Sequence, residues 1–392
     1  MKIESISLKN YKVFKDITLY DIPRFCIFVG ANGSGKSTLF DMFGFLKDAL
    51  TENIYTAINK RGGYRELRSR DAEGPIEIEI KFRESLWSPL VTYYLCINEV
   101  DNKPYIEREI LKYRRGSSGQ PWHFLDFSKG KGYAVTNELE NVKNVADLDR
   151  EGQLLAKPDI LAIKGLAQFQ RFPVVMTFGS LIENWHVSDF HINAARTIRE
   201  DGYAEHLSRE GENLSLVAKF LYENHTPIFD TILKKLEQRV PGIKTVTAKV
   251  TDEGRVLLKF QDGNFKDPFQ ARFVSDGTIK MFAYLVLLYD PSPHPLLCIE
   301  EPENQLYPTL LYELAEEFRQ YAMKGGQVFV STHSPDFLNA AELEEVFWFV
   351  KENGYTSVKR ARDDEQISAY MKDGDKMGYL WKQGFFDGAN PL

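Results

Sequence analysis

The residues from Gly30 to Thr38 read GANGSGKST and fill every position of the phosphate-binding pattern G-x-x-x-x-G-K-[ST]. An apolar run (CIFV) precedes them and a helix-length run follows, which is the strand–loop–helix context that this pattern needs. Glycines let the backbone curl so that its N–H groups point at an anion, and the helix start adds partial positive charge. The alternative is a glycine-rich turn with an incidental lysine. The pattern predicts nucleotide contacts from Gly30, Asn32, Gly33, Ser34, Gly35, Lys36, Ser37 and Thr38.

Catalysis at such a loop needs groups that hold Mg²⁺ and activate water. Lys36 is expected to bridge the β- and γ-phosphates, and the Ser37 hydroxyl is expected to bind Mg²⁺. The apolar run PLLCI ends at two acids, of which we assign Glu300 to the metal and Glu301 to the attacking water as general base. His333 follows the next apolar run and is predicted to contact the γ-phosphate and sense hydrolysis. The alternatives are a solvated acidic turn and an ordinary loop histidine.

A short polar turn opens an otherwise apolar helix. Ser275, Asp276 and Gly277 stand in FVSDGTIK, immediately before MFAYLVLLY. A serine N-cap followed by an acid and a glycine explains this stretch by itself. The turn becomes a candidate for nucleotide binding only through its place in the order of the other motifs.

Alternating helices and strands are expected to position these groups. The patterns predict a helix over 277–289, a strand over 295–300, a helix over 308–323, a strand over 327–331, a short helix from Ser334 and a strand over 345–350. The runs PLLCIE and QVFVS are continuously apolar, as is typical of a parallel sheet covered on both faces. Strand-like runs separated by turn residues predict an antiparallel meander over about 76–136, and helical patterns dominate from about 138 to 240.

The composition narrows the class of protein. The chain has 392 residues, of which 43% are hydrophobic and 27% charged, as in ordinary folded domains. A net charge of −7 argues against a protein that coats nucleic acid, although a local basic groove is still allowed. No apolar run approaches the roughly 20 residues of a membrane span, and no signal peptide opens the chain, so we expect a cytoplasmic protein without a membrane partner. Cys26, Cys96 and Cys298 are interpreted as reduced, buried thiols.

Other residues offer weaker patterns. His186 and His191 flank VSDF, but no cysteine or acid cluster nearby completes a set of metal ligands, so a structural role is favoured. The charged, glycine-containing tail after about residue 360 is expected to be mostly peripheral.

In their order along the chain, GANGSGKST, VSDGT, IEEPE and STHS resemble the motifs of ABC-type ATPases of the RecF/SMC kind, most of all compact predicted AAA-type ATPases of prokaryotes. The first hairpin, NYKVFKDITL, is also similar, and the resemblance covers about 1–50 and 270–350. It implies ATP and Mg²⁺ as ligands and two heads that face each other. Ser275, Asp276 and Gly277, the signature turn of this family, would then touch the ATP held by the other head. Asp276 replaces the first glycine of the usual pair, and Glu300 replaces the usual aspartate.

The same resemblance sets expectations for the rest of the chain. The middle has no sustained heptad pattern, so the coiled coil of SMC proteins is not expected. Too few residues follow His333 for the metal-dependent nuclease (Toprim) domain of other relatives. The segment ENQLYP would cross between heads, and Gln168 and Gln170 are candidates for the glutamine that links head and insertion.

We therefore predict an α/β fold, namely a P-loop NTPase head of the ABC type with an antiparallel β-subdomain and an inserted, mainly helical lobe. The predicted parts are an N-terminal head part with the P-loop and β-meander (1–136), the lobe (137–242) and a C-terminal head part with the signature, acids and histidine (243–392).

The leading hypothesis is a Mg-dependent ATPase whose heads form a homodimer or higher oligomer on ATP. That pairing would act as a switch on DNA or a partner protein, in DNA repair and maintenance or in antiphage defence. The alternative is an ATP-gated sensor with little turnover that regulates a separate effector protein, such as a nuclease or toxin. A transporter subunit fits poorly, because the lobe is too large and too rich in strands.

Overall fold

The computed structural model describes residues 1–85, 87–113, 121–137 and 147–389. The chain divides into two compact units. Unit 1 consists of Met1–Trp185, Glu342–Asp375 and Leu380–Leu392, and unit 2 consists of His186–Ala341 and Lys376–Tyr379. Among the described residues, no helix is both long enough and apolar enough to cross a membrane.

This division differs from the three predicted ranges. Within 137–242, the described part of the chain up to Trp185 belongs to unit 1. Strand β9 (Arg150–Leu154) extends the N-terminal sheet, and helix α5 (Pro173–Glu183) packs against helix α1 (Lys36–Thr51). The chain returns to unit 1 at Glu342, because the strand that follows pairs with the strand before the P-loop.

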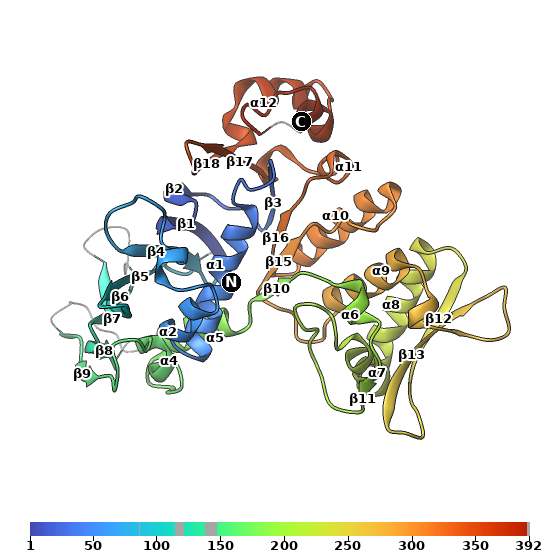
Figure 1. Cartoon of the computed structure of the whole chain (residues 1–392), viewed down its shortest axis with the longest axis horizontal. Helices are drawn as coiled ribbons and strands as arrows, with labels where there is room; N and C mark the ends of the chain where they lie inside the picture. Colours follow the sequence, from blue (N-terminus) through green and yellow to red (C-terminus); the bar gives the residue numbers. More distant parts are fainter. Residues whose placement is uncertain (86, 114–120, 138–146, 390–392) are drawn as a thin grey trace. The chain divides into compact units, whose positions relative to one another are not determined.

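Most of the strands of unit 1 belong to one antiparallel sheet (Figure 1). Its order is β2-β1-β4-β5-β6-β7-β8-β9, which confirms the predicted meander. In β4, IEIEIKFR, the side chains alternate between buried and half-buried, the period of two expected when one face of a sheet packs on a core. Besides β9, this sheet contains β1 (Lys2–Tyr11), β2 (Phe14–Leu19), β4 (Ile76–Arg83), β5 (Val91–Val100), β6 (Lys103–Tyr113), β7 (Trp122–Ser128) and β8 (Lys131–Val135).

The strand that leads into the P-loop lies outside this antiparallel sheet. Strand β3 (Phe25–Gly30) runs parallel to β17 (Val346–Glu352), and β18 (Tyr355–Arg360) pairs antiparallel with β17. Every residue of β3 is buried, as expected for a strand covered on both faces. The other helical elements of this unit are α2 (Ile54–Asn59), α3 (Tyr64–Leu67), α4 (Ala162–Leu166), α12 (Glu365–Lys372) and the 3₁₀ turns at Leu343–Glu345 and Ala361–Asp363.

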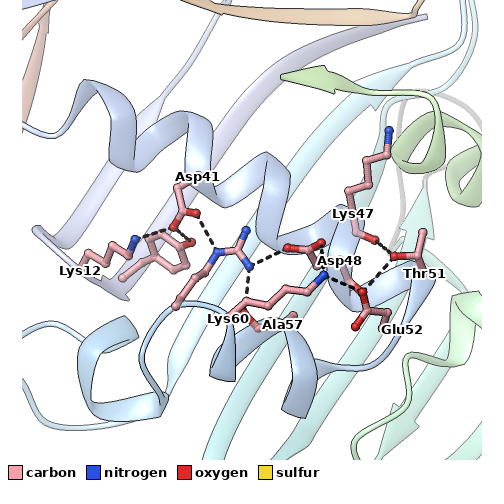
Figure 2. A network of polar contacts seen from close by, with 10 residues as sticks. Lys12, Asp41, Lys47, Asp48, Thr51, Glu52, Ala57 and Lys60 are labelled. Atoms are coloured by element: carbon pink, nitrogen blue, oxygen red, sulfur yellow. Dashed lines mark hydrogen bonds and ion pairs between the residues drawn. The ribbon is translucent and has the colours of Figure 1, made fainter. Parts of the chain in front are cut away.

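Ion pairs fix the helix that follows the P-loop. Asp41 of α1 accepts hydrogen bonds from Lys12 Nζ at 2.6 Å and from Arg61 Nε at 2.7 Å. Arg61 also donates to Asp48 at 2.8 Å, and Lys60 lies 3.1 Å from the same carboxylate (Figure 2). Burial opposes ionisation of Asp41, but Arg61 and Lys12 outweigh it and hold the pKa of Asp41 below its ordinary value. The network therefore ties α1 to the turn after β1 and to α2.

The C-terminal tail is not peripheral, contrary to the sequence-based expectation. Ile367 of α12, Trp381 of α13 (Met377–Lys382) and Phe386 are all buried. Trp348 Nε1 of β17 donates a hydrogen bond to the carbonyl of Asp387 at 3.3 Å. A few apolar residues scattered among charged ones therefore anchor this segment to unit 1.

Unit 2 contains the predicted alternation from the helix over 277–289 to the short helix from Ser334, with ends within one or two residues of those expected, and the strand predicted over 345–350 is β17 of unit 1. Strands β10 (His186–Ser188), β15 (Leu296–Glu300) and β16 (Gln327–Ser331) are parallel neighbours. The helical elements are α6 (Ile192–Ala195), α7 (Leu214–Asn224), α8 (Thr226–Arg239), a 3₁₀ turn (Ala271–Phe273), α9 (Asp276–Leu288), α10 (Pro308–Met323) and α11 (Pro335–Leu338). A second, antiparallel sheet joins β11 (Arg199–Glu200), β12 (Ile243–Val250), β13 (Arg255–Asp262) and β14 (Phe269–Gln270).

Candidate nucleotide site

The P-loop of unit 1 has the backbone conformation of an anion cradle. Gly30, Gly33 and Gly35 have φ angles of 153°, 74° and 106°, which residues with a side chain rarely adopt. A Cβ on Gly35 would also lie 2.8 Å from Val13 Cγ2, so the loop has no room for a larger residue there. Thr356 Oγ1 of β18 donates a hydrogen bond to the carbonyl of Ser34 at 2.7 Å and so holds the loop to β18. Gly30 and Gly35 are therefore required for both conformation and space, whereas Gly33 is required for its conformation alone.

The start of α1 is suited to a phosphate group. Gly35 is the N-cap, and this residue has no side chain that could cap the helix. The first N–H groups of a helix lack partners within the helix and carry partial positive charge. Lys36 is buried, and its Nζ donates to the carbonyl of Gly30 at 2.8 Å. Asn32, Gly33 and Ser37 are exposed, so a ligand can reach the loop. Loop and helix end therefore fit the phosphates of a nucleotide.

In unit 2, the structure brings the two predicted acids and the histidine together. Glu300 is the last residue of β15 and pairs in register with Ser331 of β16. Glu301 follows with a φ of 43°, and its N–H donates to the carbonyl of Ser331 at 2.9 Å. His333 Nε2 lies 3.4 Å from Glu301 Oε1, and Asn304 Nδ2 donates to Glu301 Oε2 at 2.8 Å. A non-glycine residue in the left-handed region costs free energy and is frequent at functional sites.

The sequence analysis placed Glu303 in the acidic turn and at the start of ENQLYP, whereas the structure gives it a positioning role. Its Oε1 accepts hydrogen bonds from Thr332 Oγ1 at 2.8 Å and from the N–H of His333 at 2.7 Å. Burial raises the pKa of Glu303, and these two bonds act in the opposite direction. Glu303 therefore holds the loop on which His333 stands. No local sequence pattern could reveal this contact.

The signature turn is exposed and its serine caps a helix. Ser275 Oγ accepts from the N–H of Thr278 at 3.3 Å, as the simpler interpretation of the stretch predicts. Asp276 forms an ion pair of 2.6 Å with Arg196, which also donates to the carbonyl of Val274. Ser275 is nevertheless exposed, and Gly277 follows it at the start of α9. Capping fixes the turn and leaves it accessible from outside.

Helix α9, which begins at the signature turn, directly contacts the acidic turn that carries Glu301 and Glu303. Lys280 of α9 is buried, and its Nζ donates to the carbonyl of Glu301 at 3.2 Å. Burial lowers the pKa of Lys280 to about 8, although Glu303, Asp189 and Glu301 favour its charged form. A Cβ on Gly277 would lie 2.9 Å from the carbonyl oxygen of Gln305. The glycine thus allows α9 to approach the turn closely.

The predicted site residues therefore form two sets. The P-loop residues, including Thr38, belong to unit 1, and Ser275, Glu300, Glu301 and His333 belong to unit 2. Gln168 and Gln170 lie between α4 and α5 of unit 1.

Comparisons with known proteins agree with these motifs. The family model described as "AAA domain, putative AbiEii toxin, Type IV TA system" matches residues 25–85 and 149–339, more than half of the chain. A comparison with curated protein sequences finds no match.

Two solved structures show the fold. The first is described as an SmcHead bound to the C-winged helix domain of ScpA; it is 14% identical, with a TM-score of 0.57 over 92% of this chain and 98% of that chain. The second is an Smc head domain with an extended coiled coil, bound to the C-terminal domain of ScpA and derived from Pyrococcus furiosus. It is 13% identical, with a TM-score of 0.52 over 94% of this chain and 99% of that chain. They confirm the predicted α/β, ABC-type head fold, and the chain belongs to the AAA-domain family whose model it matches.

Proposed function

We propose that this protein is a Mg-dependent ATPase whose ATP-bound heads pair and so act as a switch on DNA or a partner protein. The observation that carries the proposal is the P-loop, in which three glycines with positive φ lead into the start of α1, with glycine as its N-cap. Lys36, buried at the centre of this loop, supplies the cation expected at the β- and γ-phosphates.

The chemistry is divided between the two sets of residues. Ser37 and Glu300 would hold Mg²⁺, which neutralises the charge that develops on the transferred phosphoryl group. Glu301 accepts a proton from the attacking water, and Asn304 and His333 orient its carboxylate. His333 contacts the γ-phosphate from a loop that Glu303 holds in place.

Pairing of two heads would complete the site. Ser275 is exposed at the start of α9, where the helix N-terminus favours an anion. In the proposed pair, Ser275, Asp276 and Gly277 contact the γ-phosphate of the nucleotide on the other head. Lys280 connects this turn to the carbonyl of Glu301, so that loss of the phosphate can change the conformation of both the signature turn and the Glu301 turn. The SMC heads similar in fold are described with a bound protein domain, which supports a protein partner as one target of the switch.

The family description also supports the second candidate, an ATP-gated regulator of a toxin or nuclease with little turnover of its own. The two candidate functions share the nucleotide site and differ in the rate of ATP hydrolysis. An ATPase stimulated by DNA or a partner favours the switch, and tight ATP binding with almost no hydrolysis favours the regulator.

Two substitutions test the proposed site. Lys36→Ala should abolish ATP binding, measured with a fluorescent ATP analogue. Glu301→Gln should keep ATP binding, lower the hydrolysis rate at least a hundredfold and double the mass on ATP, measured by light scattering. Asp336→Asn removes an exposed acid of the same unit and controls for the loss of charge. If Glu301→Gln hydrolyses ATP as fast as the wild type, the assignment of the general base is wrong.

A further inference from the structure

A second cluster of metal-ligand side chains lies in unit 2, away from the acidic turn. His206, Asp290 and His294 each present one ligand atom, and these atoms lie within 4.8 Å of one another. His206 stands between β11 and α7, and the other two stand in the loop DPSPH between α9 and β15. The sequence analysis considered His186 and His191 as the metal-ligand candidates of this region, because Asp290 and His294 are distant from both in sequence.

The distances, one of which is a hydrogen bond between His206 and Asp290, are close to those around a small divalent ion. His206 Nδ1 is 2.7 Å from Asp290 Oδ2, and His294 Nε2 is 4.0 Å from the same oxygen. Zinc bonds of about 2.0–2.2 Å in a tetrahedron place neighbouring ligand atoms about 3.3 Å apart. Shifts of less than about 1 Å in these side chains would therefore let all three bind one ion.

Neighbouring groups hold the ligands in place. The N–H of Ser292 donates to Asp290 Oδ1 at 2.8 Å, which leaves Oδ2 facing the two imidazoles. Tyr321 Oη donates to the carbonyl of His294 at 2.7 Å, and Asn213 Nδ2 donates to the carbonyl of His206 at 2.9 Å. The Ser292 bond orients the Asp290 carboxylate, and the other two bonds fix the backbone from which the imidazoles project.

The burial of the cluster allows both retention and entry. The Asp290 and His294 side chains are 4% and 8% exposed, whereas that of His206 is 40% exposed. The ring of His186 stacks on that of His294 with centroids 4.9 Å apart and packs the inner side. An ion can therefore reach the cluster past His206 and be shielded on the other side.

We propose that His206, Asp290 and His294 bind a divalent transition metal of the Zn²⁺ class at a site separate from the nucleotide. Two imidazoles and one carboxylate suit Zn²⁺ and its first-row neighbours, whereas Mg²⁺ and Ca²⁺ prefer oxygen ligands alone. The site would join the loop after α9 to the segment before α7 and so fix the end of the signature helix.

The position of the cluster separates it from the proposed catalytic metal. His294 precedes the first residue of β15, and Glu300 is the last residue of that strand. The strand alone places the two ends roughly 13 Å apart. One ion cannot serve both places, and binding at the cluster does not depend on the P-loop.

The test uses the full chain without a histidine tag, treated with a chelator and then dialysed against Zn²⁺. Elemental analysis should find one Zn²⁺ per chain in the wild type and also in Lys36→Ala. His206→Ala and Asp290→Asn should each weaken Zn²⁺ binding at least tenfold. His206 is partly exposed, so its removal should leave the fold intact, which far-UV circular dichroism checks.

A matched control is His191→Ala. His191 Nε2 lies 3.5 Å from Asp189 in the same unit, but the side chains of this pair are 58% and 46% exposed. Among the described residues, no third ligand joins this pair. His191→Ala should keep the wild-type affinity. Co²⁺ in place of Zn²⁺ should give the visible absorption of a low-coordinate site in the wild type and lose it in His206→Ala. A wild-type chain that takes up no Zn²⁺, or a His206→Ala chain that binds it equally well, would overturn the proposal.

Discussion

A buried glutamate behind the P-loop helix leads to a quantitative prediction of how stability changes with pH. Glu109 of β6 is fully buried and accepts hydrogen bonds from the N–H of Ala162 at 2.5 Å and of Ile163 at 3.2 Å. Tyr93 Oη donates to the same carboxyl at 3.1 Å. The side chain thus caps α4, which packs against α1. Burial raises the pKa of Glu109 from 4.5 to about 7, against the effect of the three hydrogen bonds.

The raised pKa sets both the sign and the size of the effect. Between pH 4.5 and 7 the folded protein holds a proton on Glu109 that the unfolded chain has lost. The resulting stabilisation is complete below pH 4.5 and is lost as the pH rises through about 7. The full shift corresponds to about 3 kcal/mol, of which about 2 kcal/mol falls between pH 5 and pH 7.

The variant Glu109→Gln removes the titrating group and keeps its shape. It should be less stable than the wild type at pH 5 by about 1–3 kcal/mol, because the amide NH₂ faces a backbone donor. Its free energy of unfolding should change by about 2 kcal/mol less than that of the wild type between pH 5 and pH 7. Urea unfolding at both pH values measures the difference, and Glu77→Gln, which removes another carboxylate bonded to a tyrosine of this sheet, is the control. Equal changes in the wild type and Glu109→Gln would refute the reasoning.

Three further changes test the two units. Gly35→Ala should weaken ATP binding at least tenfold and cost about 1–2 kcal/mol in urea unfolding; Gly254→Ala, with a φ of 73° and open space around an added Cβ, isolates the cost of conformation alone. Because burial lowers the pKa of Lys280 to about 8, the wild type should gain stability relative to Lys280→Met in thermal unfolding as the pH rises from about 8 to 10; parallel profiles would contradict this. Arg196→Ala should loosen the turn at Asp276 by about 1 kcal/mol, seen as faster amide exchange at the start of α9.

The sequence predicts the local elements well, because each is encoded in a continuous run. The strand predicted over 327–331 and the helix predicted over 308–323 have the same bounds in the structure. The run QVFVS is apolar throughout, and Pro308 marks the first helical residue. The P-loop could be predicted for the same reason, since its glycines and lysine are adjacent.

The contacts between distant segments could not be predicted. Glu303 holds the His333 loop and Lys280 reaches the Glu301 carbonyl through tertiary contacts that no periodicity encodes. His206 and Asp290 meet only because the chain folds back within unit 2. The tail looked peripheral because its few apolar residues, such as Trp381, are separated by charges. In each case the partner is too far along the chain for a local pattern to reveal it.

The pairing of β3 with β17 has a consequence for how the protein matures during synthesis. Ile27 lies opposite Val346, 319 residues later (346 − 27), so one edge of the P-loop strand stays without this neighbour until that length of chain has been synthesised. A wholly buried, apolar strand with an open edge is prone to associate with other chains in that interval. Contacts between such distant residues also slow folding. The nascent protein should therefore depend on chaperones until β17 has been synthesised, and fragments that stop before β17 should aggregate.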